Sequence, residues 1–174
     1  MSQPTEPSAE AAAVTLRPMR WWDIPAVHHL EQELFQADPW SESMFWSELA
    51  GVPESRWYVV AERAGTVVAY AGLLAIREEA DIQTVAVHPD EQGTGLSGRL
   101  MDALLAEAGT RGCTQVFLEV RAENVPAQRL YEKYGFDQVA VRRGYYGPDA
   151  DGIVMRLNMK DQVPSSPPTP KVIR

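Results

Sequence analysis

The sequence predicts a mixed α/β fold in which a mixed sheet carries helices on its faces. Three observations lead to this fold class. The expected element order is β-α-α-β-β-β-α-β-α-β-β, which is not the strict alternation of a doubly wound sheet. One β-branched strand enters a glycine-rich loop and then a helix within residues 81–105. The chain of 174 residues is long enough for one domain with a real core.

The N-terminal half begins with an alternating apolar and polar strand at residues 14–19. Asp23 followed by Pro25 is typical of a helix start, and Ser41 is a suitable N-cap for a second, shorter helix. Two strands follow, at 57–61 and 67–76, and the link between them contains Gly65, which favours a hairpin.

The central stretch, residues 81–105, predicts a site for an anionic ligand. Its strand contains Val85, Ala86 and Val87, and a loop with Gly93 and Gly95 leads into a helix. Apolar residues then recur every four positions, at Leu96, Leu100, Leu104 and Ala108. The first N–H groups of a helix have no partner within it and lie at the positive end of its dipole. This geometry suits phosphate or pyrophosphate.

The C-terminal half supplies the last strands and one more helix. Gly112 ends the preceding helix, and the expected elements are a strand at 116–120, a helix from Asn124 to Gly135, and strands at 136–141 and 153–157. A Gly- and Asp-rich loop around Tyr145 and Tyr146 is expected between the last two strands. Residues 1–13 and the Pro/Ser-rich residues 161–174 are predicted to be disordered tails that flank one domain at 14–160.

Composition narrows the possible partners. The net charge of −8 disfavours nucleic acid and suits a cationic substrate such as an amine or a basic peptide. The single Cys113 excludes an intramolecular disulfide, and His28, His29 and His88 are too scattered for a metal site. No membrane span or secretory signal is recognisable, so we expect a cytoplasmic protein. We also expect a monomer or weak dimer, and no bound metal.

The glycine loop formally matches a dinucleotide fingerprint, because Gly93, Gly95 and Gly98 have the spacing G-x-G-x-x-G. We disfavour this interpretation because five residues separate the strand from Gly93, whereas the dinucleotide turn is tight. Too little chain also remains for further βα repeats. A nucleoside-triphosphate loop is excluded because no Lys-Ser/Thr pair follows the glycines.

The spacing Gln92-x-x-Gly95-x-Ser97 instead resembles the pyrophosphate loop of the GNAT acetyltransferases, which share this element order. Within that superfamily the chain is most similar to the bacterial ribosomal-protein-alanine N-acetyltransferases. Four further segments carry this likeness in the right order: Asp38-Pro39-Trp40-Ser41-Glu42, the run from Leu118 to Asn124, the run from Leu130 to Phe136, and Arg142-Arg143-Gly144-Tyr145-Tyr146.

The resemblance implies the GNAT fold, which has a mostly antiparallel central sheet, a splayed pair of strands and helices on both faces. It also implies acetyl-coenzyme A as the cosubstrate. The strand before the glycine loop would bind pantetheine through its backbone and polarise the thioester carbonyl. The implied cofactor contacts are Val85, Ala86, Val87, Gln92, Gly93, Thr94, Gly95, Leu96, Ser97, Gly98, Asn124 and Tyr131. Asn124 has a sufficient structural role as a helix cap, and one residue can do both.

Glu119 and Tyr131 are the candidate catalytic residues. Glu119 interrupts an apolar strand, so we expect it to be partly desolvated, as a general base often is. Alternatively, it is a strand-end acid paired with Arg121 or Arg142. Tyr131 lies on the apolar stripe of its helix and would ordinarily be a core residue. The family likeness assigns Glu119 as general base and Tyr131 as general acid for the thiolate.

Aromatic residues are the candidates for binding the acceptor. Tyr145 and Tyr146 resemble residues that hold the substrate peptide in N-terminal acetyltransferases, or they simply cover the end of the sheet. Trp40 either lines the same groove or packs the first two helices together. Cys113 is expected to be an inert core thiol, which favours direct attack in a ternary complex over an acetyl-cysteine intermediate.

The predicted function is therefore transfer of an acetyl group from acetyl-coenzyme A to a protein N-terminal amine, with the N-terminal alanine of a small-subunit ribosomal protein as the family's substrate. Three alternatives stay open. The acceptor could be a lysine or a small-molecule amine, or the chain could be a non-catalytic coenzyme A-binding module. A nicotinamide oxidoreductase remains the alternative for the glycine loop.

Overall fold

The computed structural model describes residues 12–162, and the expected disordered tails fall almost entirely outside them. A seven-stranded sheet has the order β1-β2-β3-β4-β5-β7-β6. Its strands are β1 (Val14–Pro18), β2 (Arg56–Arg63), β3 (Thr66–Ile76), β4 (Glu79–Val87), β5 (Gln115–Arg121), β6 (Asp137–Gly147) and β7 (Ala150–Asn158). Every neighbouring pair is antiparallel except β4 and β5. The expected mixed, mostly antiparallel sheet and the element order are confirmed.

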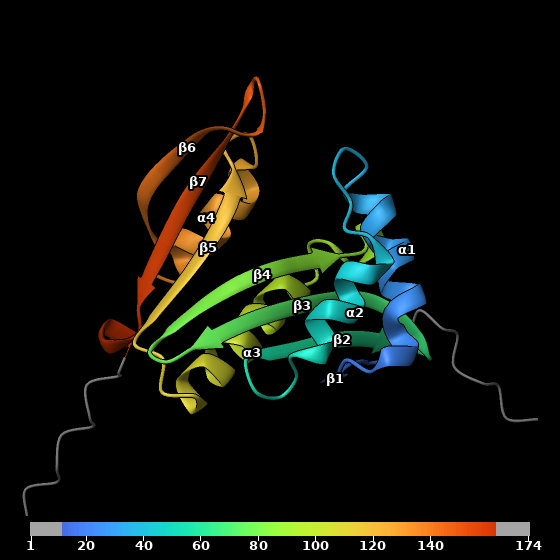
Figure 1. Ribbon diagram of the computed structural model, residues 1–174. Helices are drawn as coiled ribbons and strands as arrows, with labels where there is room; N and C mark the ends of the chain where they lie inside the picture. The colour runs from blue at the N-terminus through green and yellow to red at the C-terminus, as the bar shows by residue number, and fades with distance from the viewer. Residues whose placement is uncertain (1–11, 163–174) are drawn as a thin grey trace, which may run out of the picture.

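The sheet opens between its two central strands. β4 and β5 pair only over residues 79–82 and 115–118, and then they diverge (Figure 1). The divergence divides the sheet into one arm of β1 to β4 and a second arm of β5, β7 and β6. The expected splayed pair of strands is present, and the backbone of β4 beyond Ile82 has no strand on its β5 side.

Helices cover both faces, as Figure 1 shows. Helices α1 (Ile24–Leu34) and α2 (Glu42–Ala50) lie on one face of the first arm, where Ile24, Phe45 and Tyr70 form a buried cluster. Helix α3 (Leu96–Thr110) lies on the opposite face and buries Leu100 and Leu104. Helix α4 (Val125–Lys133) packs against this second core on the side of β5.

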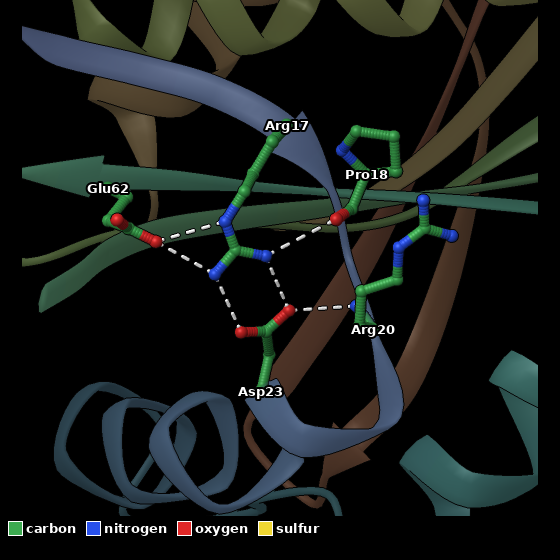
Figure 2. Close-up of polar contacts among 5 residues, drawn as sticks. All are labelled: Arg17, Pro18, Arg20, Asp23 and Glu62. Carbon is green, nitrogen blue, oxygen red and sulfur yellow. Dashed lines mark hydrogen bonds and ion pairs between the residues drawn. The ribbon is translucent and has the colours of Figure 1, made fainter. Parts of the chain in front are cut away.

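An arginine on β1 ties the start of α1 to the sheet (Figure 2). The Arg17 guanidinium donates to both carboxylate oxygens of Asp23, at 2.7 and 2.8 Å, and to Glu62 on β2. Asp23 also accepts the Arg20 N–H at 2.8 Å. Asp23 is the residue just before α1, so the helix start expected from Asp23 and Pro25 is confirmed. Its side chain binds Arg17 and Arg20 and does not cap the helix.

The expectation of a loop around Tyr145 and Tyr146 is wrong, because both residues belong to β6, which runs to Gly147. Pairing between β6 and β7 is irregular between Arg142 and Gly147, and the Asp151 carboxylate accepts the Gly144 N–H at 2.8 Å. Most of β6 is exposed, so it lacks the alternation of buried and polar residues that marks a strand in sequence.

Candidate active site

A cleft of about 420 Å³ opens where β4 and β5 separate. It brings together six of the predicted site residues, from five different parts of the chain. These residues are Trp40, Val85, Glu119, Asn124, Tyr131 and Tyr146. The segment between α1 and α2 forms the opposite wall with Phe35, Gln36, Ala37 and Asp38. The cleft therefore has walls from both arms of the sheet.

Glu119 reaches the cleft because of its position on β5. Val116, Leu118 and Val120 are buried on the helix-covered face, so strand alternation directs Glu119 to the opposite face. Its side chain is 29% exposed, which matches the expected partial desolvation. Its Oε1 accepts a hydrogen bond from Arg142 Nη1 at 2.6 Å. Glu119 is thus both a cleft residue and the partner of Arg142, whereas Arg121 pairs with Glu123 at 3.4 Å.

Tyr131 reaches the same cleft from α4. Its ring packs against Phe136, with centroids 6.0 Å apart, and is only partly buried. Burial, with a smaller contribution from Tyr146, raises the pKa of Tyr131 to about 12. The phenol therefore stays protonated at neutral pH and is able to donate a proton. Tyr131 thus packs against the core and also borders the cleft, and its role as general acid stays a prediction.

The free side of β4 presents backbone groups to the gap. The His88 N–H donates to the Val68 carbonyl at 2.8 Å, and Val87 pairs opposite Ala69. Residues of an antiparallel strand direct their backbone groups alternately to its two sides, so Val85 and Val87 direct theirs away from β3. The Ala86 side chain is buried under α1 and α2, and Val87 is buried in the other core.

The glycine loop begins where β4 ends. Gly93 and Gly95 have φ angles of 76° and 84°, a left-handed conformation that glycine adopts without strain. The helix ladder of α3 begins with the Arg99 N–H, which donates to the Gly95 carbonyl at 3.2 Å. The N–H groups of Leu96, Ser97 and Gly98 precede that bond and are available to an anion.

Side chains around the glycine loop hold its shape. The Gln92 amide donates to the Val87 carbonyl at 3.3 Å, and the Thr94 hydroxyl donates to the Glu91 carbonyl at 2.6 Å. The Tyr134 hydroxyl donates to the Gly98 carbonyl at 2.9 Å. Residues 92–98 do not line the cleft itself; they lie beyond the end of β4, which borders it. A ligand that contacts both the cleft and residues 92–98 must therefore be long.

Two arginines stack on the predicted substrate tyrosines. The Arg121 guanidinium lies 4.4 Å from the centre of the Tyr146 ring, and that of Arg142 lies 4.7 Å from the Tyr145 ring. The tyrosines contact each other edge to face at 4.9 Å. A hydrogen bond with Glu119, and the charge of that residue, raise the pKa of Tyr145. Tyr145 itself is exposed and does not line the cleft.

Glu31 is a cleft residue that the sequence analysis missed. It is only 4% exposed and accepts the Trp40 N–H at 2.9 Å and the Tyr70 hydroxyl. This carboxylate holds the segment that forms the wall opposite β5. Trp40 packs against Phe45, with ring centroids 5.4 Å apart, so it both lines the cleft and joins the helix pair. The sequence does contain a signal for this residue, because Glu31 is a carboxylate on the apolar stripe of its helix.

The remaining predictions concern the helix cap, the thiol and possible metals or membrane spans. The Asn124 side chain accepts the Ala127 N–H at 3.2 Å, so its capping role is confirmed. Cys113 is buried, as expected, and burial raises the pKa of its thiol. Within residues 12–162 no group of His, Cys, Asp or Glu is arranged to hold a metal ion. None of the helices in that range is long and apolar enough to cross a membrane.

Comparisons with known proteins identify the family. The acetyltransferase (GNAT) family matches residues 24–136. The [ribosomal protein bS18]-alanine N-acetyltransferase of Escherichia coli K12 is 37% identical over 147 residues, which are 82% of this chain and 96% of that protein. The N-alpha-acetyltransferase RimI of Mycobacterium tuberculosis is 38% identical over 160 residues, 88% of this chain and 98% of that protein.

Solved structures give the same result. The crystal structure of the Escherichia coli ribosomal-protein-S18-alanine N-acetyltransferase has a TM-score of 0.76 at 35% identity and covers 84% of this chain and 94% of that one. The structure of Ard1 from Thermoplasma volcanium has a TM-score of 0.77 at 29% identity and covers 84% of this chain and 97% of that one. With the splayed strands and the glycine loop at α3, these matches show that the chain belongs to the GNAT family of acetyltransferases.

Proposed function

We propose that this protein is an N-alpha-acetyltransferase that uses acetyl-coenzyme A to acetylate the N-terminal alanine of ribosomal protein bS18. The names of the relatives that are 37% and 38% identical over most of the chain support this acceptor. The observation that carries the chemistry is the cleft itself. A carboxylate, Glu119, and a protonated phenol, Tyr131, line it beside the free edge of β4.

The residues present fit acetyl-coenzyme A. The N–H groups of Leu96, Ser97 and Gly98 would bind its pyrophosphate at the start of α3. A side chain at Gly98 would lie 3.4 Å from the Tyr134 hydroxyl, so the absence of one leaves this approach open. Val85 and Val87 would pair with the pantetheine arm as an added strand does, and an N–H of this edge would donate to the thioester oxygen.

Acyl transfer to an amine requires a neutral nucleophile and a protonated leaving group. A protein α-amine has a pKa of about 8, so about a tenth is neutral at pH 7, against less than a thousandth of a lysine. Glu119 would take the proton of the incoming ammonium in place of its hydrogen bond from Arg142. Tyr131 then gives its proton to the departing thiolate. The amine nitrogen bonds to the acetyl carbon as the carbon–sulfur bond breaks. The nitrogen then loses its second proton to solvent, and Tyr131 regains a proton from solvent.

The acceptor is tested with two peptides of one sequence that begin with alanine and contain one lysine. One peptide has a free N-terminus and the other an N-terminal block. With acetyl-coenzyme A, we expect one acetyl group on the free α-amine and none on the blocked peptide, read by mass. Equal acetylation of the blocked peptide would show a lysine acceptor and contradict the proposal.

The role of Glu119 is tested with Glu119→Gln, which keeps the shape of the side chain but cannot accept a proton. We expect kcat to fall by about 10²- to 10⁴-fold. Glu123→Gln is the matched control, because Glu123 is an exposed carboxylate just beyond the same strand. A Glu119→Gln enzyme as fast as the control would rule out general-base catalysis by Glu119.

A further inference from the structure

Three exposed tryptophan side chains contact one another: Trp21 and Trp22, just before α1, and Trp46 on α2. Trp21 is 61% exposed, Trp22 57% and Trp46 46%. The rings of Trp21 and Trp46 stack with centroids 6.4 Å apart, and Trp22 contacts Trp21 edge to face at 5.5 Å. We call these three residues the tryptophan surface. A continuous exposed aromatic surface typically marks an interaction site.

The tryptophan surface is not needed to hold the helices in place. Helix α1 is anchored through its own buried residues, Ile24, Val27 and Leu30, and α2 through Phe45. These residues face the sheet, where they form a cluster with Tyr70. Trp21, Trp22 and Trp46 are not part of that cluster, and each is about half exposed or more. Their exposure therefore has no explanation in the packing of the domain.

The segment that carries this surface is acidic, although the exposed Arg20 directly precedes Trp21. Residues 21–55 contain seven Asp and Glu and no Lys or Arg, so this fifth of the chain carries −7 of the net charge of −8. Asp23 and Glu48 are paired with Arg17 and Arg56, and Glu31 is buried. Four carboxylates are exposed and have no ion pair within the described residues: Glu33, Asp38, Glu42 and Glu54.

We propose that the tryptophan surface binds a Lys- and Arg-rich segment of the polypeptide substrate, downstream of the N-terminal residue that is acetylated. Cationic side chains bind over tryptophan faces, and a negative surround strengthens that attraction. The proposal rests on the proposed function, because a ribosomal protein binds RNA and must carry such cationic segments. The occupant is thus the acceptor protein itself.

The position of the surface agrees with this occupant. Trp40 lines the cleft and lies just before α2, while Trp46 is on α2, four residues after its first residue, Glu42. The rise of a helix places Trp46 about 6 Å along the axis from Glu42. An extended peptide advances about 3.3 Å per residue, so a segment within about ten residues of the amine is able to reach it.

The same charges disfavour other occupants. A second copy of the chain would bring two acidic faces together at a twofold interface, which like charges oppose. Nucleic acid and anionic membrane surfaces would be repelled as well. The Trp46 indole N–H donates to Glu42 at 3.4 Å, so the aromatic and acidic groups form one surface.

The test compares the KM values of three peptides that share the same first four residues. One ends there, one continues with six alternating Lys and Arg, and one continues with six Gln. For the wild-type enzyme we expect the basic peptide to have a KM at least tenfold below that of the Gln peptide, with equal kcat. Added NaCl should erase most of this difference.

Two variants remove the surface by different means. Trp21→Gln/Trp46→Gln removes the aromatic faces, and Glu33→Lys/Glu42→Lys reverses the charge. Both should bring the KM ratio of the basic and Gln peptides close to one, and leave kcat and the KM of the four-residue peptide unchanged. Ile76→Gln is the matched control, because Ile76 is an exposed apolar residue at the end of β3.

A binding measurement separates this proposal from the proposed function. The basic peptide is made with its N-terminus already acetylated, and its binding is followed by fluorescence anisotropy of a label at its C-terminus. We expect a Kd at least tenfold weaker for both variants. If the peptides are not turned over but this difference is present, the acceptor is wrong and the docking surface stands.

Two results would overturn the docking surface. The first is an unchanged KM ratio in both variants. The second is a change in solution mass of the tryptophan variant with no change in KM, which would make the surface a self-association site.

Discussion

At the scale of single residues, the surroundings of Glu119 and Tyr131 suit them to opposite proton transfers. The Glu119 carboxylate is partly exposed and accepts from Arg142, so it is accessible to an incoming ammonium. The Tyr131 phenol is held neutral by burial, with its pKa raised to about 12. A base open to the acceptor and an acid beside the β4 edge are what the proposed reaction needs.

Tyr131→Phe should lower kcat by about 10²-fold or more without changing the melting temperature, because the ring keeps its packing against Phe136. Because the pKa of Tyr131 is raised, its neutral form persists into alkaline solution. The kcat of the wild-type enzyme should therefore show no loss attributable to this phenol below a pH of about 10. Steady-state rates across pH, with melting curves for both proteins, provide the measurement.

Tyr134→Phe is the contrasting variant at the next turn. It removes the hydrogen bonds to the Gly98 carbonyl and to Asp102, both 2.9 Å long. It should cost about 1 kcal/mol of stability and change the KM of acetyl-coenzyme A more than kcat. An unchanged kcat in the Tyr131 variant would remove Tyr131 from the chemistry.

At the scale of elements, the turn from β4 into α3 forms the proposed anion site, because its glycines orient the first N–H groups of the helix. Gly95 has a φ of 84° immediately before α3, and a Cβ added there would meet no atom within 4 Å. The cost of a side chain at this position is therefore backbone strain alone. Gly65, in the turn between β2 and β3, has a φ of 81° and equally open surroundings.

Gly95→Ala and Gly65→Ala should each lower the free energy of unfolding by about 1 kcal/mol, since both force an L-residue into the left-handed region. Only Gly95→Ala should raise the KM of acetyl-coenzyme A, by severalfold or more, because it tilts the N–H groups that face the pyrophosphate. Denaturant titrations and steady-state kinetics on both variants test this. Equal KM values would place the pyrophosphate elsewhere.

At the scale of the whole molecule, two arms of one sheet meet along a short parallel contact of four residue pairs. A ligand that runs along β4 to the start of α3 fills the space left by the missing strand pairing. Such binding adds RT ln(1 + [L]/Kd) to the stability, about 2.7 kcal/mol at a hundredfold excess over Kd. Ligand binding should therefore stabilise the glycine loop and the free β4 edge together.

Acetyl-coenzyme A should therefore slow amide hydrogen exchange at residues 83–87 and 93–98, and leave β1 and β2 unchanged. The reason is that the N–H groups of Val85 and Val87 gain partners that β5 does not supply. Exchange followed by mass spectrometry, with a nicotinamide dinucleotide as the comparison ligand, makes the measurement. Equal protection by the dinucleotide would revive the nucleotide-binding interpretation of the glycine spacing.

The sequence by itself determined the features that depend on neighbours along the chain. The α1 start at Asp23 and Pro25, the Ser41 and Asn124 caps, the glycine loop and the carboxylate in an apolar strand are all local signals. Helix caps and periodic burial act within a few residues, so they can be read without tertiary structure. For that reason the element order and Glu119 were both predictable.

Only the tertiary structure decided which residues meet. Glu119 and Arg142 are 23 residues apart, and Glu31 and Tyr70 are 39 apart. From the sequence alone, Glu119 had two possible partners, Arg121 and Arg142. The part of β6 beyond Val141 was missed because its exposed and irregular pairing with β7 leaves no periodic burial. Long-range partners depend on how the sheet closes and splays, and the local sequence does not encode that geometry.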